Sequence, residues 1–191
     1  MKPIDYQPLF RTAIVVPESI AEKERAWGDI PDILGSMLRE FKVVPMKALD
    51  MGVLFGYSTY ALAMYFDEVV GIDTFGNNRY NYMDTGEDHY EEVKELLKVR
   101  DNVSLIKTTW QDYAEANKDA KYDLIHLDMI HTYRETFKAG DWALQHTNFA
   151  IFHDTVSNPT VMNACGDLAD KYNCDFYNYE PSHGLGILIK K

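Results

Sequence analysis

Short apolar runs alternate with longer segments of helical periodicity along most of the chain. The runs lie at residues 47–50, 69–72, 102–107, 122–127 and 149–152, and segments such as 57–66 and 89–99 between them carry apolar residues at helical spacing. Uninterrupted apolar runs of this length are typical of strands buried on both faces of a parallel sheet. The alternation predicts an α/β fold, a Rossmann-like doubly wound sheet with helices on both faces.

The two ends of the chain have different patterns. Two further strands are expected at 174–179 and 185–189, paired near one edge of the sheet. Residues 1–20 contain three prolines and predict an extended segment, and 19–41 predict one or two helices. We expect one domain over residues 1–191. Within it, 1–45 would form an extended and helical segment that is a candidate cover for the active site.

The most informative stretch is residues 48–75, which predicts a strand, a turn, a helix and a second strand. Gly52 and Gly56 have no side chain, so a ligand can approach the backbone closely there. Near the first turn of the following helix, free N–H groups and the Ser58 and Thr59 hydroxyls can hold a carboxylate. Asp73 ends the second strand, where a carboxylate can accept both hydroxyls of a ribose. A ligand with an amino-acid end and a ribose fits this pattern.

A dinucleotide-binding fold is the alternative for the same stretch. Its fingerprint is G-x-G-x-x-G, whereas this chain has G-x-x-x-G and no evident pyrophosphate turn. The glycines could also serve packing alone, with an aspartate as a helix cap.

The pattern D-x-G-x-x-x-G-x-S-T, which begins at Asp50, resembles motif I of class I S-adenosylmethionine (SAM) methyltransferases. Asp73 matches the acidic residue of motif II. The resemblance implies SAM as cofactor and a seven-stranded sheet with an antiparallel last strand. It also implies that SAM lies across the ends of the first and fourth strands of that fold, within reach of Asp128. Trp110 follows the third strand of that fold, where it is either part of an adenine pocket or a core residue.

A second group of polar residues follows the runs at 122–127 and 149–152. Asp128 and Asp154 end adjacent predicted strands, so their carboxylates can converge. Converging carboxylates repel each other unless a counter-ion is present. Oxygen-rich ligation favours Mg²⁺, Ca²⁺ or Mn²⁺ over Zn²⁺. His131 can face the same site, and its pKa class suits a general base near neutral pH.

Residues 122–155 resemble more closely the small O-methyltransferases related to macrolide-sugar methyltransferases and cephalosporin-hydroxylase-like proteins. Catechol O-methyltransferases share the site geometry. The resemblance implies that Asp128 and Asp154 are metal ligands, that His131 is the base, and that Thr155 occupies an asparagine ligand position. The chain departs from the family pattern at Met129 and at 145–148, and threonine is a weaker metal ligand than asparagine. These departures concern the metal more than the fold.

Charge and cysteine content limit the classes of partner and the compartment that the sequence predicts. The formal net charge is −11, which disfavours nucleic acid or an anionic membrane as a partner. No run is apolar enough to span a bilayer, and the first ten residues lack a signal-peptide pattern. Cys165 and Cys174 predict reduced, buried thiols in a cytoplasmic protein. A homodimer is compatible with the sequence.

Taken together, the sequence predicts a SAM-dependent enzyme that methylates a hydroxyl of a small molecule such as a sugar, phenol or polyketide, with metal assistance. The alternative is a SAM- or nucleotide-binding module without methyl transfer. The polar loop at 76–88, with Tyr80, Tyr82 and Met83, is either a solvated insertion or part of an acceptor pocket.

Overall fold

The structure is a computed structural model, and it describes residues 1–23, 26–76 and 88–191. The loop predicted at 76–88 therefore lies almost entirely outside the described residues. Cys165 and Cys174 are buried free thiols, as expected. Among the helices of these three ranges, none combines the length and apolar character needed to cross a membrane.

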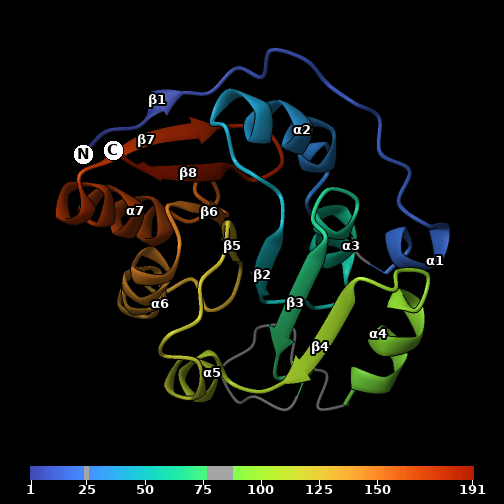
Figure 1. Cartoon of the computed structure of the whole chain (residues 1–191). Coiled ribbons are helices and arrows are strands. Elements are labelled where there is room, and N and C mark those ends of the chain that lie inside the picture. The colour runs from blue at the N-terminus through green and yellow to red at the C-terminus, as the bar shows by residue number, and fades with distance from the viewer. Residues whose placement is uncertain (24–25, 77–87) are drawn as a thin grey trace.

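Within the described residues, eight strands form one sheet in the order β1-β7-β8-β6-β5-β2-β3-β4 (Figure 1). All neighbouring strands are parallel except β8, which runs antiparallel to both β6 and β7. The strands are β1 (Ile4–Asp5), β2 (Lys47–Met51), β3 (Glu68–Asp73), β4 (Val103–Lys107), β5 (Leu124–Leu127), β6 (Phe149–His153), β7 (Cys174–Tyr179) and β8 (Leu185–Lys190).

The predicted fold class is confirmed, including the antiparallel last strand. The prediction of seven strands omits β1, which pairs with the edge strand β7. This strand has only two residues, both exposed, so it carries no apolar pattern. It forms because β7 offers an unpaired edge, which is a property of the folded sheet.

Helices cover both faces of the sheet (Figure 1). One buried cluster joins α2, α3 and α4 to one face, and a second joins α5, α6 and α7 to the other. Successive strand residues such as Ala48 and Leu49 belong to opposite clusters, as the period of two requires. The helices are α1 (Glu18–Ala21), α2 (Ile30–Glu40), α3 (Tyr57–Ala63), α4 (Tyr90–Leu97), α5 (Trp110–Ala116), α6 (Tyr133–His146) and α7 (Pro159–Tyr172).

The order of the strands brings three aspartates to one edge of the sheet. Strand β5 lies between β2 and β6, and all three run parallel. Asp50 is in register with His126 on β5, Asp128 follows β5, and Asp154 follows β6. Because the carboxyl ends of parallel strands share one edge, the three side chains gather there.

Gly52 allows the loop after β2 to pass close to the end of β5. Its φ is +104°, and a Cβ there would lie 1.8 Å from the Asp128 carbonyl oxygen. A carbonyl on the backbone cannot move away as a flexible side chain can.

We therefore predict that Gly52→Ala destabilises the protein by about 3 kcal/mol or more, through a clash and a strained backbone. Chemical denaturation measures the free energy of unfolding. Gly35→Ala is the matched control, because a Cβ there meets side chains alone, the far end of Tyr65 at 3.2 Å and the Phe10 ring at 3.6 Å. Equal stability of the two variants would contradict the prediction.

Candidate functional site

Asp50 lies at the centre of a buried polar network beneath the loop after β2. Its Oδ2 accepts hydrogen bonds from the hydroxyls of Ser58 at 2.7 Å and Thr59 at 2.5 Å. Its Oδ1 lies 2.6 Å from Nδ1 of His126, which is fully buried. Trp27, from the segment before α2, places its ring edge-on to His126, with centroids 4.6 Å apart. These contacts join the first turn of α3 to β2, β5 and the N-terminal segment.

Four predicted cofactor contacts are thus occupied by the protein itself. The Ser58 and Thr59 hydroxyls point to Asp50 inside the protein. The space beside Gly52 is filled by the Asp128 carbonyl, and that beside Gly56 by Leu97. Gly56 has a φ of +91° at the start of α3. Contact of these residues with a cofactor stays a prediction, and their backbone groups are the atoms left to make it.

Asp73 and Trp110 come at or just after the ends of neighbouring strands, at the carboxyl edge of the sheet. Asp73 ends β3 in register with Lys107, the last residue of β4, and Trp110 follows as the first residue of α5. Backbone N–H groups of Leu54 and Phe75 donate to separate oxygens of the Asp73 carboxylate, at 2.9 and 2.8 Å. Both Asp73 and Trp110 are half-buried. The carboxylate is therefore held in a fixed orientation while part of the residue reaches solvent.

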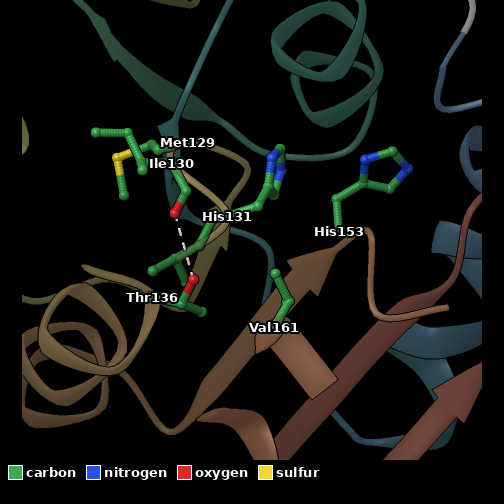
Figure 2. Close-up of a pocket in the computed structure, with 7 residues that line it drawn as sticks. Met129, Ile130, His131, Thr136, His153 and Val161 are labelled. Atoms are coloured by element: carbon green, nitrogen blue, oxygen red, sulfur yellow. Dashed lines mark hydrogen bonds between the residues drawn. The ribbon is translucent and has the colours of Figure 1, made fainter. Parts of the chain in front are cut away.

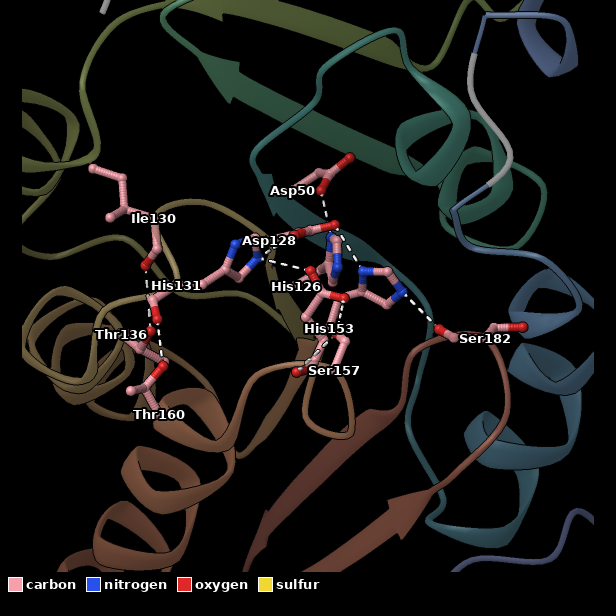
Figure 3. A network of polar contacts seen from close by, with 11 residues as sticks. Asp50, His126, Asp128, Ile130, His131, Thr136, His153, Ser157, Thr160 and Ser182 are labelled. Carbon is pink, nitrogen blue, oxygen red and sulfur yellow. Dashed lines mark hydrogen bonds and ion pairs between the residues drawn. The ribbon is translucent and has the colours of Figure 1, made fainter. Parts of the chain in front are cut away.

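The second predicted group comes together as a compact cluster of Asp128, His131 and Asp154, of which Figure 3 labels the first two. Nε2 of His131 lies 3.1 Å from Asp128 Oδ1 and 3.0 Å from Asp154 Oδ2. One potential ligand atom from each residue lies within 4.8 Å of the others. All three side chains are partly exposed, so a ligand from solvent can reach them.

His153, the last residue of β6, is a further contact of Asp128. Its Nδ1 lies 3.0 Å from Asp128 Oδ2, and its Nε2 lies 2.9 Å from the carbonyl of Ser182 (Figure 3). A carbonyl and a carboxylate both accept hydrogen bonds, so both ring nitrogens must donate. The arrangement therefore requires His153 in its protonated form beside an ionised Asp128.

Thr155 does not join the cluster. Its residue is 1% exposed, and its hydroxyl donates to Oδ1 of Asn178 at 2.6 Å. Asp141, another acidic residue of this half of the chain, lies on α6 and pairs with Lys171 and Tyr172. Among the residues that the structure describes, two aspartates and one histidine are therefore brought together as potential metal ligands.

Electrostatics within the cluster follow from these contacts. Burial alone would lower the pKa of His131, but hydrogen bonds to Asp128 and Asp154 outweigh it and raise the pKa to about 9. Burial would raise the pKa of Asp128, but hydrogen bonds from His131 and His153 hold it far below its usual range. The pKa of Asp154 is lowered, because the hydrogen bonds of His131 and Ser157 outweigh burial. In the protein alone, imidazolium groups supply the counter-charge.

A small cavity of about 10 Å³ lies between these histidines and the apolar side chains around them (Figure 2). His131 and His153 line it together with Met129 and Val161. This volume is far too small for a cofactor of nucleoside size.

Comparison with known proteins assigns this arrangement to a family. Residues 49–155, more than half of the chain, match a family described as a methyltransferase domain. The chain belongs to this family. The matched range begins within β2 and ends just after Asp154, so it includes both polar groups described above. The prediction of a methyltransferase is confirmed.

Solved structures share the fold at low sequence identity. An O-methyltransferase from Bacillus cereus in complex with SAH has a TM-score of 0.63 and 15% identity, over 93% of this chain and 94% of that one. TomG, an O-methyltransferase from Streptomyces achromogenes in complex with SAM, has a TM-score of 0.62 and 14% identity, over 96% and 93%. The SAH-bound methyltransferase PaMTH1 from Podospora anserina has a TM-score of 0.64 and 14% identity, over 94% and 91%.

A search of curated proteins finds no match to this chain.

We predict that His131 titrates with a midpoint near 9 in metal-free protein, because both carboxylates favour its charged form. The raised pKa adds stability that is fully present below the ordinary value of 6.5 and is lost as the pH rises through 9. NMR of the imidazole protons in the presence of a chelator measures the midpoint. His131→Gln assigns the signal, and the stability difference between this variant and the parent should shrink over the same pH range. A midpoint near 6.5 would contradict the prediction.

Proposed function

We propose that the protein transfers the methyl group of SAM to a hydroxyl of a small molecule, with a divalent cation held beside the acceptor. The observation that carries the proposal is the cluster of Asp128, His131 and Asp154, one strand away from the motif I loop in a methyltransferase domain. The shared fold of TomG, solved with SAM, and of the Bacillus cereus O-methyltransferase, solved with SAH, supports the choice of cofactor and of an oxygen acceptor.

The residues at the carboxyl edge fit SAM. Asp73 holds a carboxylate at the end of β3, and each of its oxygens keeps a lone pair beyond the backbone N–H that it accepts. Such a group can accept the two hydroxyls of a ribose. Trp110, at the end of the neighbouring strand, offers an aromatic surface for adenine. SAM supplies a methyl carbon bound to a positively charged sulfur, and the protein must align the acceptor oxygen with it.

The cluster also fits a divalent cation. The carboxylates of Asp128 and Asp154, with ligand oxygens within 4.8 Å of each other, form an oxygen donor pair that suits Mg²⁺ or Mn²⁺. Asp128 and Asp154 would hold the ion, and its charge would lower the pKa of a hydroxyl beside it. Thr155, with its hydroxyl on Asn178, adds no ligand atom in this arrangement.

His131 would then act as the base. As long as it pairs with two ionised carboxylates, its pKa of about 9 keeps it protonated at neutral pH, and it cannot accept another proton. Once the carboxylates are neutralised by other charge, the interactions that raise its pKa weaken, and the imidazole returns toward its ordinary range. His131 can then take the proton of the acceptor hydroxyl as the oxygen bonds to the methyl carbon and the carbon–sulfur bond breaks.

Two substitutions separate cofactor binding from proton transfer. Asp73→Ala should weaken S-adenosylhomocysteine binding at least tenfold, because it removes a charged hydrogen-bond acceptor. His131→Ala should bind the same ligand as the parent does and lower turnover by roughly 100-fold or more, because it removes a base. Calorimetry with S-adenosylhomocysteine, with NAD as the control ligand, measures the binding affinity. An assay with an acceptor found by screening measures turnover. Equal loss of binding in both variants would contradict this division of roles.

Metal binding distinguishes the ligands that the structure brings together from the one that the family pattern implies. Asp128→Asn and Asp154→Asn should each weaken Mn²⁺ binding roughly tenfold or more, because each removes a charged ligand. Thr155→Val should leave Mn²⁺ affinity unchanged, because the hydroxyl is bound to Asn178. Electron paramagnetic resonance of free and bound Mn²⁺ gives the affinities. A large loss with Thr155→Val and none with Asp154→Asn would reverse the ligand assignment.

A further inference from the structure

The turn between β7 and β8 supplies one of the two hydrogen bonds that hold His153. Ser182, His183 and Gly184 all have positive φ values in this turn. With this backbone, the Ser182 carbonyl lies 2.9 Å from Nε2 of His153, whose side chain is 1% exposed. The other ring nitrogen contacts Asp128. The orientation of the His153 ring therefore links the position of this turn to one oxygen of the Asp128 carboxylate.

The other side of the same turn is bound by the segment before α2. The Ser182 hydroxyl donates to Asp29 Oδ1 at 2.7 Å and accepts from the Asp29 backbone N–H at 3.2 Å. Gly28 makes this approach possible: its φ is +48°, and a Cβ there would lie 2.4 Å from the Ser182 hydroxyl oxygen. Two segments about 150 residues apart in the sequence are thus joined by a reciprocal pair of hydrogen bonds.

Asp29 is itself held in place from the opposite side. Its Oδ2 accepts from the Tyr179 hydroxyl at 2.5 Å and from Nη1 of Arg11 at 2.5 Å. Nη2 of Arg11 donates to the Tyr179 hydroxyl oxygen, also at 2.5 Å. Burial alone would raise the pKa of Asp29, but the hydrogen bonds of Tyr179, Ser182 and Arg11 outweigh it and lower the pKa. The carboxylate therefore stays ionised and has both oxygens occupied.

We propose that Asp29 is a positioning residue for Asp128, acting through Ser182 and His153. The order of contacts is Asp29 to the Ser182 hydroxyl, the Ser182 carbonyl to His153, and His153 to Asp128 Oδ2. Fixing Oδ2 leaves Oδ1 directed at His131, which also contacts Asp154. The importance of Asp128 rests on the proposed function, whereas the effect of Asp29 on His153 does not.

A competing explanation is that packing alone orients His153. The Trp27 ring lies near it, with centroids 6.4 Å apart, and belongs to the same N-terminal segment. If packing were sufficient, loss of the Asp29 carboxylate would leave the His153 hydrogen bonds unchanged. The two explanations therefore predict different rates of solvent exchange for the proton on Nε2 of His153.

The experiment follows the proton on His153 Nε2 by NMR of histidine-labelled protein. Its exchange with solvent should be slow in the parent, because the ring is buried and bound to a carbonyl. Asp29→Asn should speed this exchange about tenfold, because it weakens the hold on the turn. Ser182→Ala keeps the carbonyl but removes the hydroxyl, and should have a similar effect. The double variant should exchange no faster than the more affected single variant, because both act in one path.

Asp32→Asn is the matched control. Asp32 lies three residues further along and holds the same N-terminal segment through the backbone N–H of Ile14 at 2.9 Å. The Asp32→Asn variant should leave the exchange rate of the His153 proton at the parent value. His153→Gln identifies the NMR signal by removing it. Exchange at the parent rate in Asp29→Asn, or equal acceleration in Asp32→Asn, would overturn the proposal.

Mn²⁺ and S-adenosylhomocysteine affinities separate this proposal from the proposed function. In Asp29→Asn, we expect Mn²⁺ affinity to fall several-fold and S-adenosylhomocysteine affinity to stay at the parent value. If the parent binds neither ligand while Asp29→Asn and Ser182→Ala still speed the exchange, the proposed function fails and the positioning role stands. Unchanged Mn²⁺ affinity with faster exchange would overturn the effect on Asp128.

Discussion

Burial of carboxylates at one edge of a parallel sheet is the constraint on which this structure depends. A carboxylate removed from water needs hydrogen-bond donors or positive charge, or it becomes protonated. The sheet places Asp50, Asp128 and Asp154 at the ends of three adjacent strands, so each must find donors nearby. Much of the polar structure around β2, β5 and β6 consists of those donors, and they come from loops and helices far apart in the sequence.

The three aspartates meet this requirement in different ways, and the difference assigns them different roles. Asp50 is fully buried, and the protein supplies the two hydroxyls and the one ring nitrogen that contact its carboxylate, so it stabilises the turn after β2. Asp128 and Asp154 instead share His131, which is partly exposed. A shared, exposed counter-charge can be exchanged for another cation at low cost, whereas a buried hydroxyl pair cannot. The partners of Asp50 thus lie inside the protein, whereas Asp128 and Asp154 stay within reach of solvent, as the proposed function requires.

The core strands could be predicted from the sequence because their apolar runs are short and continuous. The convergence of Asp128 and Asp154 could be predicted because parallel strands end at one edge of the sheet. The sequence could not reveal that Ser58 and Thr59 would bind Asp50, since hydroxyls can serve a ligand or a neighbour equally well. For the same reason it could not reveal that the Thr155 hydroxyl would bond to Asn178, which lies on a different strand. Ser182 was missed because its contribution to the site is a backbone carbonyl, which leaves no mark in residue type.

The pairing of β1 with β7 has a consequence for how the protein is made. Residues 4–5 bind residues 177–178, so the first strand of the sheet has no partner until nearly the whole described chain has left the ribosome. Contacts of such long sequence separation form slowly, because a large loop must close before they yield any stabilisation. Residues 4–5 therefore have no strand partner through most of synthesis. The three prolines among residues 1–20 would help to keep this segment from pairing wrongly with other chains during that time.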